Sequence, residues 1–93
     1  MERDINTTRV VFLKDLDNDG EINAIFPDFE LPNDELTCYA HIGQHQECSR
    51  RWARGKMRVE AKAGEITALY NELTNLVGYN LVIVGKDAIK KAA

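Results

Sequence analysis

The sequence predicts an α+β fold in which a small antiparallel sheet is packed by one long and one short helix. Two apolar segments with the composition of strands, 9–14 and 21–26, flank a turn rich in Asp, Asn and Gly. Apolar residues then recur at helical spacing over 65–77. The chain has 93 residues, so we expect a single domain over 1–93, with loose ends at 1–8 and 86–93.

The first two strands are predicted to form a hairpin. RVVFLK, residues 9–14, is apolar on both faces, and EINAIF alternates so that Ile22, Ala24 and Phe26 share one face. Pro27 is expected to end the second strand, because proline has no N–H to donate to a neighbouring strand. An acidic loop over 28–35 should follow.

Residues 36–42, LTCYAHI, fit either a third strand or a helix. As a strand, the segment places Cys38, Ala40 and Ile42 on one face. As a helix, it would be capped by Asn33 and ended by Gly43. The strand is favoured.

A short helix is predicted over 46–54 and a long one over 65–77. The long helix has one apolar stripe, and Gly78 follows it where a left-handed residue commonly ends a helix. The segment LVIV, residues 81–84, is predicted to close the sheet as a buried C-terminal strand.

The composition is that of a globular protein, with 44% hydrophobic and 29% charged residues. No segment approaches the roughly 18 apolar residues of a membrane span, and the polar first residues do not resemble a secretory signal. We therefore expect a cytoplasmic protein with reduced thiols and no membrane partner. Two cysteines are too few for a disulfide framework.

Charge is distributed unevenly along the chain. Residues 1–47 hold eleven acidic and three basic residues, a net charge of −8, whereas 48–93 hold four acidic and nine basic residues, a net charge of +5. This asymmetry predicts either a surface with two poles or internal pairing between the two halves.

Cys38, His41, His45 and Cys48 form the pattern C-x2-H-x3-H-x2-C, whose residue types are ligands of zinc. A strand would place Cys38 and His41 on opposite faces, and zinc fingers commonly separate their ligand pairs by a dozen or so residues. We therefore expect no cofactor. The alternative is a small metal-binding module, with zinc held by these four residues or by the last three folded around Gly43.

The same segment offers a Cys–His catalytic pair as a further alternative. Cys48 follows His45 by three residues, and the nearby Arg50 and Arg51 would favour a thiolate. The sequence identifies no oxyanion hole and no third catalytic group, so an enzyme is the less favoured interpretation.

DLDNDG, residues 15–20, resembles the start of a calcium-binding loop. Asp15, Asp17 and Asp19 occupy its first, third and fifth positions and Gly20 its sixth. However, Phe26 stands at the twelfth position, where such loops have a bidentate Glu. An Asp-rich hairpin turn is therefore favoured.

SRRWARGKMR, residues 49–58, combines five basic residues with Trp52, a pattern typical of a nucleic-acid contact. Alternatively, its arginines pair with the acidic half and Trp52 packs in the core. We expect the protein to act by binding a macromolecular partner, either protein or nucleic acid. The predicted contact surface includes His41, Gln44, His45, Arg50, Arg51 and Arg54.

The central motif Y-x-H-x-G-Q-H, within TCYAHIGQHQECS, resembles that of a family of small proteins from bacterial genomes, plasmids, conjugative elements and phages. The hairpin segments VVFLKD and EINAIFP and the ending EITALYNELTNLVGYNLVIV are also similar, so the resemblance covers most of 10–84. The family has no established activity, and the resemblance implies an accessory protein of a mobile element or its host. Its cysteines vary, which argues against a cysteine-dependent site. This chain departs from the family at ARGKMRVEAKAGE, where relatives tend to have a proline before the long helix.

Overall fold

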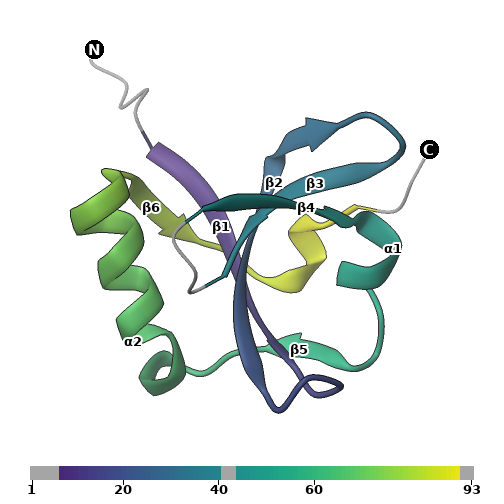
Figure 1. The fold of residues 1–93 in the computed structure, drawn as a ribbon, viewed down its shortest axis with the longest axis horizontal. Coiled ribbons are helices and arrows are strands. Elements are labelled where there is room, and N and C mark those ends of the chain that lie inside the picture. Colours follow the sequence, from purple (N-terminus) through teal and green to yellow (C-terminus); the bar gives the residue numbers. More distant parts are fainter. Residues whose placement is uncertain (1–6, 41–43, 91–93) are drawn as a thin grey trace.

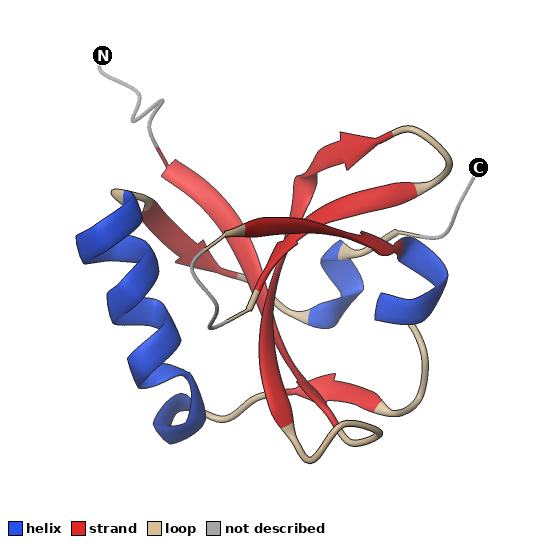
Figure 2. Cartoon of the chain, in the orientation of Figure 1, coloured by secondary structure: helices blue, strands red, loops and turns tan. Residues whose placement is uncertain are grey.

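The computed structural model describes residues 7–40 and 44–90. Within these residues, six strands form one sheet of order β4-β3-β2-β1-β5, with β6 also paired to β1 (Figures 1 and 2). The strands are β1 (Thr7–Asp15), β2 (Glu21–Leu31), β3 (Glu35–Tyr39), β4 (His45–Ser49), β5 (Arg58–Glu60) and β6 (Asn80–Ile83). The combination of this sheet with helices agrees with the predicted α+β class.

The helical segments are α1 (Arg50–Ala53), α2 (Ala63–Asn71), the π-helical turn η1 (Glu72–Val77) and the 3₁₀ turn η2 (Lys86–Ala88). Because η1 continues α2 without a break, the two make one long helix, which confirms the helix predicted over 65–77. It ends at Gly78, whose φ is 100°. The N–H groups of Gly78 and Tyr79 both donate to the Leu73 carbonyl at 3.0 Å. None of the helices described is long and apolar enough to cross a membrane.

The predicted hairpin of β1 and β2 is confirmed, with Val11 opposite Ile25. The prediction that Pro27 ends β2 is wrong, because the strand continues to Leu31. The pairing of β2 with β3 is irregular between Phe26 and Glu30. Pro27 therefore lies in a bulge. The regular hydrogen-bond ladder is interrupted there, so proline can be accommodated without an N–H group. The loop predicted over 28–35 is reduced to the turn at 32–34.

β3 confirms the strand that was favoured within 36–42, as far as Tyr39, while residues 41–43 lie outside the described ranges. The short helix predicted over 46–54 is wrong in its first half, because residues 45–49 form β4, antiparallel to β3. Pairing with a neighbouring strand here overrides the local preference for helix. The helix α1 begins only after Ser49, whose Oγ accepts the Trp52 N–H at 2.9 Å.

The sheet is mixed, and not antiparallel as predicted. β6 pairs in parallel with the first half of β1, through Thr7–Val10, whereas β5 pairs antiparallel with Leu13–Asp15 in its second half. The long helix between β5 and β6 carries the chain back to the level of Thr7, so β6 can run alongside β1 in the same direction. Thr7 and Thr8, which were expected to be loose, therefore lie in a paired strand.

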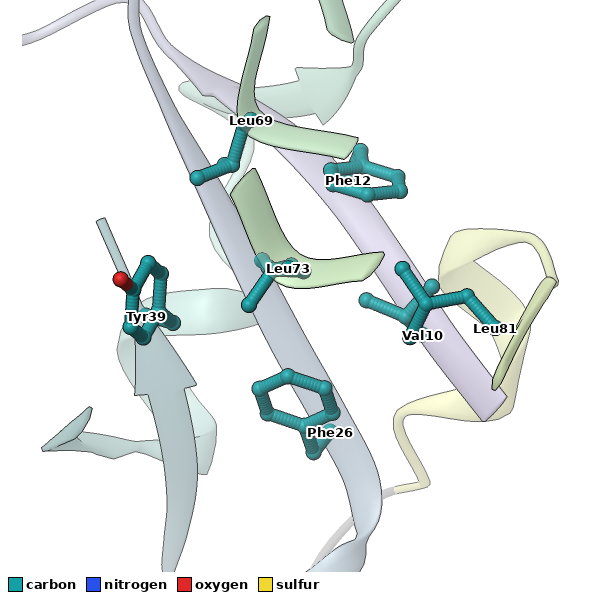
Figure 3. Close-up of a cluster of buried hydrophobic side chains, with 8 residues drawn as sticks. Val10, Phe12, Phe26, Tyr39, Leu69, Leu73 and Leu81 are labelled. Atoms are coloured by element: carbon teal, nitrogen blue, oxygen red, sulfur yellow. The ribbon is translucent and has the colours of Figure 1, made fainter. Parts of the chain in front are cut away.

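Both faces of the sheet are covered. On one face, Leu69 of α2 and Leu73 of η1 pack over strand residues (Figure 3); this cluster comprises Val10, Phe12, Ala24, Phe26, Tyr39, Leu69, Leu73 and Leu81. On the other face, α1 and the C-terminal segment pack against the strands. The cluster there comprises Val11, Leu13, Ile25, Leu36, Cys38, Ala53 and Ile89. Ile89 is 0% exposed, although the sequence predicted a loose end from residue 86.

Candidate functional site

Arg50, predicted to contact a partner, is engaged inside the protein. Its Nε donates to Asp34 Oδ1 at 2.8 Å, its Nη1 donates to the Lys90 carbonyl at 3.1 Å, and it forms an ion pair with Glu30 at 3.5 Å. The hydrogen bond with Asp34 raises the pKa of Arg50 above its usual value. With its side chain 9% exposed, Arg50 joins parts of the fold and leaves little surface for a partner.

The other predicted contact residues differ in their surroundings. Gln44 and Arg51 are exposed, and Arg51 forms no hydrogen bond or ion pair within residues 7–40 and 44–90. Arg54 is exposed too, but its Nη1 donates to the Ile89 carbonyl at 2.6 Å. His41 lies outside the described residues.

Arg58 pairs the basic segment with the acidic turn. Its Nη1 lies 3.0 Å from Asp17 Oδ2 and 3.3 Å from Asp15 Oδ1. Its guanidinium also lies over the Trp52 ring, 5.0 Å from the centroid. Two of the three carboxylates of the calcium-like motif are thus paired with one guanidinium, and one face of the tryptophan proposed for base stacking is covered.

The strand β4 separates the proposed zinc ligands. His45 and Cys48 are three residues apart in a strand, so they point to opposite faces of the sheet. His45 pairs with Tyr39 in register, whereas Cys48 lies on the face of Cys38. In residues 7–40 and 44–90, no three His, Cys, Asp or Glu side chains form a metal-binding group. The proposed ligand sets that join these cysteines to His45 therefore do not fit this geometry.

The same separation argues against a Cys–His catalytic pair. The pKa of Cys48 is raised by its hydrogen bond with Cys38, by burial and by the charge of Glu35. A raised pKa disfavours the thiolate that a nucleophilic cysteine needs. The predicted activation by Arg50 is not available, because that guanidinium binds Asp34.

His45 instead belongs to an aromatic cluster at the helix-covered face. Its Nε2 lies 2.8 Å from the Tyr79 hydroxyl, and its ring meets Tyr39 edge-on at 5.1 Å between centroids. The Tyr39 hydroxyl donates to the Glu72 carboxylate. That hydrogen bond, together with burial, raises the pKa of Tyr39 to about 12. The cluster therefore connects β3, β4 and the long helix through polar contacts between aromatic side chains.

Exposed apolar side chains lie beside this cluster or close to it in the sequence. The Phe29 ring stacks on Phe26 at 5.4 Å between centroids and lies 6.5 Å from the Tyr79 ring. Leu76 and Val77, shortly before Tyr79 at the end of η1, are 81% and 41% exposed. We use the name aromatic–apolar surface for Phe29, His45, Leu76, Val77 and Tyr79.

A shallow groove lies between α2 and β6. It has a volume of about 250 Å³ and is lined mainly by apolar atoms, among them those of Ile66, Tyr70 and Ile83. Ile83 is 51% exposed and the adjacent Val82 is 43% exposed. The long helix and β6 thus leave apolar side chains uncovered beside the buried stripe.

A second hollow lies on the opposite face of the sheet, and we call it the thiol hollow. It has a volume of about 270 Å³ and is lined by Asn23, Cys38, Gln46, Glu47, Cys48, Ser49 and Trp52. Both cysteines are free thiols. Three adjacent strands and α1 therefore bring two sulfur atoms and two amide side chains to one concave place.

Comparison of the chain with protein-family models, with curated proteins and with solved structures found no match. The geometry of the described residues is therefore the basis of the functional proposals below.

The sequence motif drew attention to His45, which the structure places in contact with Tyr79, but it missed the residues around it. Leu76 and Val77 fit the apolar stripe of the helix, and that pattern alone indicates burial. Tyr79 follows Gly78 and lies outside the elements that the sequence predicts. Its proximity to His45 depends on pairing between distant segments, for which the sequence offers no local signal.

Proposed function

We propose that the protein acts by binding a protein partner, and that the aromatic–apolar surface is the place of contact. The observation that carries this proposal is the 81% exposure of Leu76, together with the exposure of Val77 and Phe29, at 41% and 37%. Soluble proteins seldom gather large apolar side chains on their surface without a partner to cover them. Aromatic residues with a polar group, such as Tyr79 and His45, are also common in protein interfaces.

The composition of the surrounding segment favours protein over nucleic acid as the partner. Residues 66–84, ITALYNELTNLVGYNLVIV, contain one charged residue, Glu72, although 29% of the whole chain is charged. The Glu72 carboxylate accepts a hydrogen bond from Tyr39. A nucleic-acid site needs cations for the phosphates, and this segment has none.

The basic segment gives less support to nucleic-acid binding. Arg50 and Arg58 are paired with acidic residues of the first half of the chain, and the guanidinium of Arg58 also covers Trp52. Arg51, Arg54 and Lys56 are left as exposed cations close together in the sequence. Three such residues would give weak, strongly salt-dependent binding.

Photo-crosslinking tests the proposed surface while the partner is still unidentified. A photoreactive benzoylphenylalanine would replace Leu76 in one variant and Leu16 in a matched control, in cells that naturally contain the protein. Leu16 is also a large exposed apolar residue, 46% exposed. It lies at the turn between β1 and β2, at the other end of the molecule from the end of η1 (Figure 1). We expect a discrete crosslinked protein from position 76 and none from position 16.

Leu76→Asp and Leu16→Asp provide the quantitative comparison once that band is identified. The first should weaken binding of the crosslinked protein by about tenfold or more, because it places a charge in an apolar contact. The second should leave binding unchanged, and circular dichroism would verify that both variants are folded. Equal crosslinking from both positions, or equal binding by both variants, would contradict the proposal. Salt-sensitive binding of nucleic acid that is lost in Arg51→Ala would favour the alternative partner.

A further inference from the structure

Two thiols that the aromatic–apolar surface does not use lie together on the other face of the sheet. Cys38 in β3 is opposite Gln46 in β4, and Cys48 lies two residues farther along β4 on the same face. Both thiols are free and line the thiol hollow. Residues on adjacent strands thus bring two sulfur atoms to the same side of the sheet without a disulfide.

Asn23 provides a second, independent observation at this place. It comes from β2, is 8% exposed and lines the thiol hollow. Within residues 7–40 and 44–90, its side-chain amide has no hydrogen-bond partner. None of the buried side-chain polar atoms described is left unsatisfied, so this amide is open to the hollow and free to donate to a ligand bound there.

We propose that the thiol hollow binds one soft monovalent cation of the copper(I) class, held between the thiolates of Cys38 and Cys48. Thiolates select soft cations, and copper(I) accepts two sulfur ligands as a complete coordination shell. Zinc normally requires four ligands, whereas these two sulfurs have no third His, Cys, Asp or Glu side chain beside them in the part of the chain that the structure describes.

The surrounding residues suit such a complex. Each thiol loses one proton as its sulfur binds the cation, so two protons are released and the complex carries a charge of −1, with no oxidation or reduction. The amide N–H groups of Asn23 and Gln46 are at hand to donate hydrogen bonds to the charged sulfurs. Cys48 is half-buried, so the cation has a route from solvent that requires no unfolding.

Trp52, the one tryptophan in the sequence, lines the same hollow and provides a direct signal. The experiment is an anaerobic titration of the fully reduced full-length chain with copper(I), buffered by a chromophoric copper(I) chelator. Trp52 fluorescence would be followed, with native mass spectrometry to count bound copper. We expect the fluorescence change to saturate at one copper per chain.

The variants distinguish a chelating pair from two independent thiols. Cys48→Ser, at the less buried position, should lower copper(I) affinity by about 100-fold or more, because a single thiol loses the advantage of two linked ligands. Cys38→Ser should do the same, and Asn23→Leu should lower the affinity by about tenfold. Thermal unfolding of the metal-free variants would verify that each is folded.

Three results would overturn the proposal. The first is binding of two copper ions per chain, which would indicate independent thiols. The second is an affinity of folded Cys48→Ser equal to that of the unaltered chain. The third is tighter binding of zinc than of copper(I), which would require ligands beyond the two sulfurs.

Discussion

The Nε of Arg50 donates a 2.8 Å hydrogen bond to the carboxylate of Asp34, a residue in the turn between β2 and β3. This contact joins the basic second half of the chain to the acidic first half, and Arg58 makes a second such link to Asp17. Of the two interpretations of the charge asymmetry, internal pairing therefore accounts for two of the basic residues between 49 and 58. Arg51, beside Arg50 in sequence, takes no part in it.

Replacement of Arg50 should destabilise the protein much more than replacement of its neighbour. Arg50→Met removes the donor to Asp34 and to the Lys90 carbonyl, and we expect it to lower the free energy of unfolding by about 2–3 kcal/mol. Arg51→Met should change it by less than about 0.5 kcal/mol, because that side chain is exposed. Urea denaturation would measure both. Equal effects would show that the contacts of Arg50 do not stabilise the fold.

Two glycines, one at each end of the long helix, allow a test of backbone conformation. Gly78 has a φ of 100°, although no atom would meet a Cβ there within 4 Å. Gly78→Ala should therefore destabilise the protein by about 1 kcal/mol through backbone strain alone. Gly64, near the start of α2, also has open space around it. Because its conformation is helical, Gly64→Ala should stabilise the protein by up to about 1 kcal/mol. Thermal denaturation should show melting temperatures shifted in opposite directions.

Ile89 should be essential to stability, although it is near the end of the sequence. It is 0% exposed within the cluster beneath α1, so Ile89→Ala should cost about 2–4 kcal/mol in the free energy of unfolding. Val82→Ala, at a position that is 43% exposed, should cost less than about 1 kcal/mol. Chemical denaturation of both variants provides the measurement. A small loss at Ile89 would mean that the C-terminal segment does not pack on the sheet.

Tyr39 should make stability depend on pH in the alkaline range. Its pKa is raised from 10.0 to about 12, first by the hydrogen bond to Glu72 and then by burial. The folded state therefore retains a proton that the unfolded chain releases. This contribution is complete below pH 10.0 and is lost as the pH rises toward about 12.

Tyr39→Phe removes that contribution, so its free energy of unfolding should fall less steeply than that of the unaltered chain over this interval. At neutral pH the variant should be less stable by about 1–2 kcal/mol, because the hydrogen bond to Glu72 is lost. Urea denaturation between pH 8 and about 11.5 would measure the difference. Parallel curves for the two proteins would contradict the assignment to Tyr39.

Elements with a strong local pattern were predictable from the sequence. The alternation of Ile22, Ala24 and Phe26 indicated a strand, and the helical spacing of Leu69 and Leu73 indicated the long helix. Both patterns persist in the structure because each buries one face of its element. The end of β2 was not predictable, since the bulge that accommodates Pro27 depends on its pairing with β3.

The remaining elements depend on pairing between distant segments. β4 is a strand because it meets β3, and β5 has only three residues. The direction of β6 follows from the long helix before it. The same reason explains why the two neighbouring arginines differ. Both were predicted to be contact residues, and Arg51 is exposed, but Arg50 is buried by its pairing with Asp34, sixteen residues away.

The parallel pairing of β1 with β6 bears on how the chain reaches its fold. Thr7 is opposite Asn80, so the contact closes a loop of more than seventy residues, whereas the β1–β2 hairpin closes within a few. The entropy lost in closing a loop grows with its length, and folding rates fall as contacts become more distant in sequence. We expect the hairpin and β3 to form early and β6 to dock last. Until then, the N-terminal half of β1 keeps an unsatisfied backbone edge, which is the part of the nascent protein most open to misassociation.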